Sequence, residues 1–169
     1  MIFYRWSSEL RGAGQQPAVH ARLFALILRF HGYKAWIDND HLPIDSPHLR
    51  NTIKSELENT QLAIISIGPG DLKRCGDRDD FFRWEIETVR RFEKKGMLKV
   101  VIIVHGTEFD EDLICGVSTH TETRTRIKNT VGRWGNDILD CLKNHYVIYF
   151  DIGKADKIFE GVVSRLEDK

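Results

Sequence analysis

The chain has 169 residues, of which 41% are hydrophobic, and this is enough to bury a sizeable core as one domain without disulfides or a metal. Lysine and arginine together number 25, aspartate and glutamate also number 25, and the formal net charge is therefore zero. This balance, with the basic residues scattered along the chain, argues against a nucleic-acid partner. No apolar run reaches transmembrane length, so a membrane partner is not expected either.

The cysteines indicate a reducing compartment. Cys75, Cys115 and Cys141 are odd in number and widely spaced, which suits free thiols in the cytoplasm better than a disulfide framework. No Cys/His pair has zinc-ligand spacing, so no metal is expected, and no bound cofactor is expected either. The first residues do not resemble a signal peptide, and the chain opens almost inside a strand. We therefore expect residues 1–169 to be a single domain excised from a longer multidomain protein.

The first predicted helix runs from Pro17 to Gly32. Proline suits a first helical position because it lacks the amide hydrogen that would be unsatisfied there, and glycine is a good helix stop. Between them, apolar residues recur at helical spacing and predict one buried face. That face consists of Val19, Leu23, Leu26, Ile27 and Phe30.

The remaining pattern alternates strands with helices. The predicted strands cover residues 2–6, 33–37, 62–67, 98–104 and 146–150, and the third and fourth are nearly continuous in apolar residues, as in strands that are covered on both faces. Further helices are predicted after Ser46-Pro47, from about residue 80 to 95, at 134–143 and at 154–166. Five strands alternating with five helices predict an α/β fold with a parallel sheet covered by helices on both faces, most simply in a flavodoxin-like order.

The helix that starts near residue 80 carries the most informative carboxylate, Glu85. Asp79 or Asp80 suits the N-cap position, where a side-chain oxygen accepts an amide of the first turn. Each residue turns the helix by about 100°, so Glu87 points roughly opposite Glu85 and only one of them faces a given pocket. The buried stripe of this helix is predicted to contain Phe82, Ile86 and Val89.

Ligands of such a sheet bind outside the carboxyl ends of the strands, where the first and third strands lie side by side. This rule selects cationic, aromatic, glycine and carboxylate residues, which together suit a pyrophosphate, an aromatic base and a ribose. The selected residues are Arg5, Trp6, Ser7, Ser8, Trp36, Asp38, Gly68, Pro69, Gly70 and Glu85.

Four motifs, in matching order and spacing, resemble those of TIR (Toll/interleukin-1 receptor) domains. Phe3-Tyr4-Arg5 resembles the first box, usually Ser-Tyr-Arg, and residues 32–38 resemble the second-strand pattern that leads into the BB loop. Residues 59–67 are similar to the third strand, and residues 82–86 resemble the Trp-x-x-x-Glu-Ile/Leu helix box. The resemblance extends from Ile2 to about His105, and it is closest to the NAD-cleaving branch, which includes the axon-degeneration and bacterial antiphage enzymes. It implies a flavodoxin-like TIR fold with a five-stranded parallel sheet.

Carried over by position, the resemblance implies that the substrate is NAD+ and that its nicotinamide–ribose bond is cleaved. It also implies that the chain self-associates with other TIR domains and acts in immune or cell-death signalling. Nicotinamide leaves as a neutral molecule, so one ionised glutamate beside the oxocarbenium-like sugar is enough in principle. Hydrolysis to ADP-ribose, cyclisation to cyclic ADP-ribose and base exchange would share one site. The implied residues are Glu85 as catalytic carboxylate, with Arg5, Trp6, Ser7, Trp36, Asp38, Gly68 and Trp84 as substrate-binding residues.

Other interpretations stay open. The chain is also compatible with a non-enzymatic TIR interaction module, which the altered first box with Phe3 favours, or with a nucleoside deoxyribosyltransferase-like enzyme that acts on nucleosides without pyrophosphate. Among single residues, Arg5 also suits a structural ion pair with a loop acid, and Trp36 and Trp84 also suit packing. His105 is interpreted as a capped loop histidine.

Overall fold

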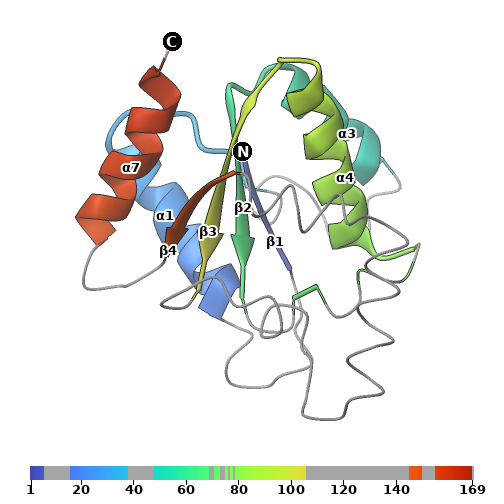
Figure 1. Ribbon diagram of the computed structural model, residues 1–169, viewed down its shortest axis with the longest axis horizontal. Helices are drawn as coiled ribbons and strands as arrows, with labels where there is room; N and C mark the ends of the chain where they lie inside the picture. The colour runs from blue at the N-terminus through green and yellow to red at the C-terminus, as the bar shows by residue number, and fades with distance from the viewer. Residues whose placement is uncertain are drawn as a thin grey trace.

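The computed structural model describes residues 1–5, 16–37, 48–68, 71, 72, 75, 77, 79–105, 145–149 and 155–168. In this part of the chain, four strands form one parallel sheet in the order β1-β2-β3-β4, with helices on both faces (Figure 1). The strands are β1 (Ile2–Tyr4), β2 (Leu62–Ile67), β3 (Lys99–Val104) and β4 (Tyr146–Tyr149). The helices are α1 (Gln16–Phe30), α3 (Leu49–Glu58), α4 (Phe81–Lys94) and α7 (Ala155–Glu167). The predicted α/β class and parallel pairing are confirmed.

The described sheet has four strands, whereas five were predicted. The missing strand is the segment 33–37, which makes a single parallel bridge between Ile2 and Ile37. The Ile2 amide donates to the Trp36 carbonyl at 3.0 Å, so the segment lies along the edge of β1 that β2 does not use. In this register Ile37 is level with Ile2, the first residue of β1, and the residues after Ile37 lie outside the described ranges. Residues 33–35 therefore lie beyond the start of that strand. The arrangement is compatible with a flavodoxin-like order.

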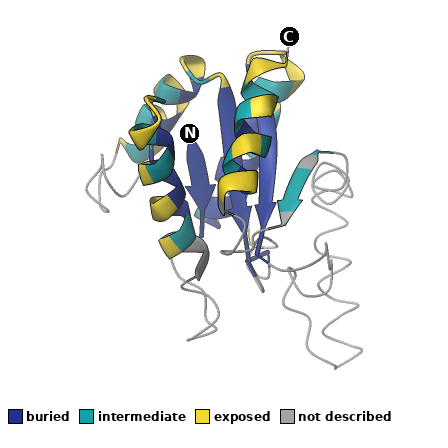
Figure 2. Cartoon of the chain, turned by 90° about the vertical axis from the view of Figure 1, so that its left-hand side faces the viewer, coloured by how far each residue is buried: buried dark blue, intermediate teal, exposed yellow. Residues whose placement is uncertain are grey.

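Helices α1 and α7 cover one face of the sheet, and α3 and α4 cover the other. Figure 2 shows β1, β2 and β3 as a buried layer between helices whose outer sides are exposed, while β4 at the edge of the sheet is half-buried. All six residues of β2 are buried, as are the last five of β3. The continuous apolar runs in these two strands are explained by this double coverage, since both faces of each strand meet a helix.

The buried face of α1 differs from the predicted one. The residues that pack on the sheet are Ala21, Phe24, Ala25 and Leu28, whereas Val19, Leu23, Leu26 and Phe30 are exposed and Ile27 is half-buried. The helix is apolar on nearly all sides, so periodicity alone selects more than one face. The two alanines let the helix backbone approach the sheet closely. Gly32 ends the helix as predicted, with φ at +87°, a conformation that glycine adopts without steric cost.

Helix α4 follows its prediction closely. Asp80 is the N-cap, and its Oδ1 accepts the Arg83 amide at 2.9 Å. The predicted stripe is buried and consists of Phe82, Ile86 and Val89. In α3 the buried residues are Ile53 and Leu57, and in α7 they are Ile158 and Val162.

Several predicted features lie outside the described residues. They are Trp6, Ser7, Ser8, Asp38, Pro69, Gly70, the Ser46-Pro47 helix start and the helix at 134–143. Within the described ranges, no helix combines the length and the apolar character that crossing a membrane requires.

Candidate functional site

Arg5 follows β1 at the carboxyl edge of the sheet and joins that strand to the start of α4. Its Nη1 and Nη2 atoms donate to the two carboxylate oxygens of Asp80 at 2.7 and 2.9 Å, while Nε donates to the Asp71 carbonyl. Nη2 also donates to Cys75 Sγ at 3.3 Å, and the guanidinium lies 5.2 Å from the ring centre of Phe82. The N-cap of α4 is thus held by the first strand.

The Arg5–Asp80 pair is buried and charged. Burial alone would raise the pKa of Asp80, but hydrogen bonds from the Arg5 side chain and the Arg83 amide lower it below its ordinary value. Burial likewise opposes the charge of Arg5, yet its hydrogen bond with Asp80 and the nearby negative groups raise the Arg5 pKa. This geometry matches the interpretation of Arg5 as a member of a structural ion pair with an acid. A phosphate would have to compete with Asp80 for the guanidinium.

Gly68, which follows β2, already uses its amide within the protein. The amide donates to Asp71 Oδ2 at 2.7 Å, and the Asp71 amide donates back to the Gly68 carbonyl at 3.2 Å. The Asp71 side chain is buried, and burial raises its pKa to about 6 against the opposing effects of the Gly68 amide and Arg5. Binding of a phosphate to this amide would require Asp71 to give way.

The two acids of α4 are separated as the helical geometry predicts. Glu85 is only 2% exposed, whereas Glu87 lies at the surface side of the helix. Glu87 pairs with Arg83 at 3.1 Å and with Arg91 at 3.8 Å. Glu85 is five residues beyond the N-cap, so it lies about 8 Å along the helix from the carboxyl edge at 1.5 Å per residue. The predicted catalytic carboxylate is therefore set well back from that edge.

Trp36 lies on the same side of the sheet as Glu85 but not beside Arg5. It is half-buried and packs against the core cluster between the sheet and helices α3 and α4. Its carbonyl is bonded to the Ile2 amide, three residues before Arg5, which places the two side chains at levels about 10 Å apart along β1. Trp36 and Arg5 were predicted to lie together at one edge of the sheet. In the structure they are instead separated along β1.

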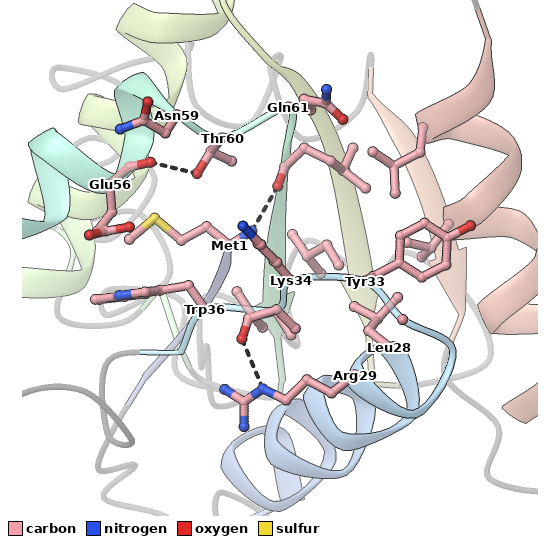
Figure 3. Close-up of a pocket in the computed structure, with 17 residues that line it drawn as sticks. Met1, Leu28, Arg29, Tyr33, Lys34, Trp36, Glu56, Asn59, Thr60 and Gln61 are labelled. Atoms are coloured by element: carbon pink, nitrogen blue, oxygen red, sulfur yellow. Dashed lines mark hydrogen bonds between the residues drawn. The ribbon is translucent and has the colours of Figure 1, made fainter.

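Trp36 instead borders a hollow of about 900 Å³ at the amino ends of β1 and β2 (Figure 3). Its lining includes the apolar residues Ile2, Leu28 and Leu62 and the charged residues Lys34 and Glu56. Backbone carbonyls around it are bonded, since the Met1 amino group donates to Leu62 and the Arg29 Nε donates to Ala35, both at 2.9 Å. Sequence reasoning missed this hollow, because a parallel sheet of this class directs attention to its carboxyl edge.

Trp84, also predicted to bind substrate, packs between α3 and α4. The charged end of Arg50 lies 5.2 Å from the Trp84 ring centre, that of Lys54 lies 5.9 Å away, and the Phe81 ring centre is at 5.3 Å. The packing interpretation therefore accounts for its position.

A polar chain of three side chains, which the sequence did not predict, lies on the α1 face of the sheet. His105 Nε2 is 2.7 Å from Ser66 Oγ, and His105 Nδ1 is 3.0 Å from His20 Nδ1. Burial and then the charge of His20 lower the pKa of His105 to about 4, and burial lowers that of His20. His105 is therefore a buried network residue and not a capped loop histidine. The available signal was Ser66, a hydroxyl inside an apolar strand that required a partner.

The sequence matches no family model, and no curated protein matches it significantly. Within the described residues, no group of three or more His, Cys, Asp or Glu side chains could hold a metal ion. The site that the geometry assembles is thus Arg5, Asp80, Asp71 and Gly68 at the carboxyl edge, with Glu85 set back on α4.

Proposed function

We propose that this chain is a TIR-type enzyme that cleaves the nicotinamide–ribose bond of NAD+, with Glu85 as the catalytic carboxylate. The observation that carries the proposal is the orientation of α4, which buries Glu85 and leaves Glu87 partly exposed. In the reaction, the bond between the ribose carbon and the ring nitrogen breaks, and nicotinamide keeps the electron pair and leaves neutral. The Glu85 carboxylate stabilises the oxocarbenium-like carbon that remains.

The fate of that carbon decides the product. Addition of water, with loss of its proton, gives ADP-ribose. Attack by the adenine ring gives a cyclic ADP-ribose, and attack by another pyridine base gives an exchanged dinucleotide. Trp36, on the same face of the sheet as α4, offers an aromatic surface for a ring, and the proposed substrate contacts also include Arg5, Trp6, Ser7, Asp38 and Gly68.

The burial of Glu85 requires an opening step. A side chain with 2% exposure does not reach a dinucleotide, so the proposal requires a second, open conformation in which Glu85 is exposed. The contacts that hold the start of α4 are the Arg5–Asp80 pair and the Gly68–Asp71 turn. We propose that self-association in the cytoplasm rearranges these contacts, which would expose Glu85 and release the Arg5 guanidinium and the Gly68 amide for the pyrophosphate.

The experiment follows nicotinamide release by chromatography. The whole chain is clustered on a surface or concentrated, incubated with NAD+, and compared with Glu85→Gln and Glu87→Gln. We expect release by the wild type and by Glu87→Gln, and a loss of at least about a hundredfold in Glu85→Gln, as expected for removal of a main electrostatic group. Circular dichroism confirms that each variant is folded. Similar release by wild type and Glu85→Gln would show that Glu85 is not the catalytic group.

A non-enzymatic TIR interaction module is the second candidate. The closed state of the carboxyl edge favours it, because Arg5, Gly68 and Asp71 already satisfy one another there. If clustered wild-type protein remains folded and releases no nicotinamide, this second candidate replaces the first.

A further inference from the structure

The hollow beside Trp36 has the size of a small-molecule site. Its volume is about 900 Å³, and such sites enclose roughly 300–1,000 Å³. Its walls come from parts of the chain that are distant in sequence: the end of α1 with the segment 33–36, the end of α3, the starts of β1 and β2, and α7 (Figure 3). It lies at the amino ends of the strands, whereas Arg5, Asp80 and Gly68 lie at the carboxyl edge. A ligand in the hollow would therefore not occupy the candidate site described above.

Hydrogen bonds between backbone groups hold the walls of the hollow in place. The Ile2 amide donates to the Trp36 carbonyl at 3.0 Å. The Tyr33 amide donates to the Leu28 carbonyl, also at 3.0 Å. A site whose walls are fixed before binding loses less conformational entropy when a ligand enters. Because these backbone groups are already paired, recognition of a ligand falls to the side chains.

Most of the side chains that line the hollow are apolar or aromatic. Four of the apolar ones are buried residues of α1 and the sheet, namely Ile2, Leu28, Leu62 and Ile64. Tyr33 and Trp36, both half-buried, add two aromatic residues to the lining. Displacing water from such walls favours a ligand with an apolar body, and aromatic side chains favour a flat ring.

The charged groups that line the hollow sum to one net positive charge. The cations are Lys34 and Arg29, whose Nε donates to the Ala35 carbonyl at 2.9 Å, and the acid is Glu56. The Met1 amino group also lines the hollow, but burial lowers its pKa to about 5, so it is neutral at pH 7. The excess of one cation favours a ligand with a single negative charge.

Lys34 is the cation best placed to meet such a ligand. Its side chain is exposed, and among the described residues no acid forms an ion pair with its ammonium group. Lys34 follows α1, whereas Glu56 belongs to α3, which covers the other face of the sheet. An anionic group is therefore attracted toward Lys34 and repelled by Glu56, and the two charges together set its orientation.

We propose that the hollow at the amino ends of β1 and β2 binds a small aromatic carboxylate. The ring packs on the apolar side chains around Ile2 and Leu62, and the carboxylate pairs with the Lys34 ammonium group. The inference requires neither NAD+ nor Glu85, because the hollow and the carboxyl edge are different parts of the molecule.

Amide NMR titration of the whole chain tests the proposal, with indole-3-carboxylate as the probe and the neutral indole-3-carboxamide as its matched comparison. We expect the carboxylate to bind with a dissociation constant of about 100 μM, as is usual for so small a ligand. The carboxamide should bind about three- to tenfold more weakly, since it lacks the charge. The largest chemical-shift changes should fall on the amides of 34–36 and 60–62.

Two substitutions should shift the affinity in opposite directions. Lys34→Gln should weaken binding of the carboxylate by about three- to tenfold, whereas Glu56→Gln should strengthen it by about two- to threefold, because it removes a repulsion. Lys157→Gln is the matched control, since Lys157 is an exposed lysine of α7 that does not line the hollow, and it should bind like the wild type. Circular dichroism confirms that each variant is folded.

Several results would overturn the proposal. They are the absence of binding up to about 5 mM carboxylate, equal affinity for the carboxamide, and binding that Lys34→Gln leaves intact. Chemical-shift changes at Gly68 and Asp71 in place of 34–36 would assign the ligand to the carboxyl edge instead. The nicotinamide assay reports separately on catalysis, so a chain that cleaves no NAD+ would still show whether the hollow binds the carboxylate.

Discussion

At the residue scale, His105 lies in buried surroundings that disfavour its charged form. Its Nδ1 faces His20 Nδ1 at 3.0 Å, so one of these nitrogens must donate and the other accept. Protonation of both rings would set two N–H groups against each other. Burial, followed by the charge of His20, accordingly lowers the His105 pKa from 6.5 to about 4.

This shift predicts acid sensitivity. The unfolded chain takes up the proton near pH 6.5, whereas the folded chain resists it down to about pH 4. The contribution of His105 to the free energy of unfolding is therefore complete above pH 6.5 and is lost as the pH falls toward 4, by at most about 3 kcal/mol. Urea unfolding at pH 7 and pH 4.5 measures the difference.

The comparison with His105→Gln isolates this effect. Burial raises the pKa of Asp71 to about 6, so Asp71 favours the folded state as the pH falls through the same range and partly masks the histidine. Glutamine keeps a hydrogen-bonding side chain and does not titrate, and the variant should lose less stability than the wild type on acidification. Equal losses in the two proteins would mean that His105 does not set the acid response.

At the element scale, the start of α4 depends on a charge as well as on a cap. Asparagine is as good an N-cap as aspartate, so Asp80→Asn should keep the helix start but leave the Arg5 guanidinium buried without its carboxylate. We expect a loss of about 3 kcal/mol in the free energy of unfolding. Asp79→Asn, at the exposed neighbouring position, should change it by less than about 0.5 kcal/mol. Urea denaturation followed by circular dichroism compares them.

The double variant Arg5→Met, Asp80→Leu distinguishes the two contributions. It removes both charges together and should be more stable than Asp80→Asn, because no buried charge is left unpaired. An Asp80→Asn protein as stable as the wild type would show that the cap alone holds α4 in place.

These elements also show what the sequence could predict. The cap and buried stripe of α4 depend on residues within two turns of one another, and both were predicted. The partners of Arg5 lie up to 75 residues away, so the choice between ion pair and ligand contact required the packed sheet. The face of α1 was mispredicted because apolar residues surround the helix. In the candidate site, helical geometry was enough to predict that Glu85 and Glu87 point in different directions. The position of Trp36 along β1 depends on the register of two strands, which no local sequence pattern encodes.

At the scale of the whole molecule, the sheet should be most protected at its centre. β2 and β3 pair over six residues, from Leu62 with Lys99 to Ile67 with Val104, and both are covered on two faces. In the part of the chain that the structure describes, the segment 34–37 is attached to β1 through a single bridge. Amides of β2 and β3 should therefore exchange with solvent only on global unfolding, at least about a hundredfold more slowly than those of 34–37.

Hydrogen exchange at pH 7, read by mass spectrometry of short peptides, measures this order. The peptides of β2 and β3 provide the reference for global unfolding, and increasing urea should accelerate their exchange together if the centre of the sheet opens as one unit. The segment 34–37 should exchange at a rate that low urea leaves unchanged, because its opening exposes little surface. If 34–37 instead proves as protected as β2, the segment pairs with β1 in a different register and over more residues than one bridge, and the sheet in solution has the five strands that the alternating pattern predicts.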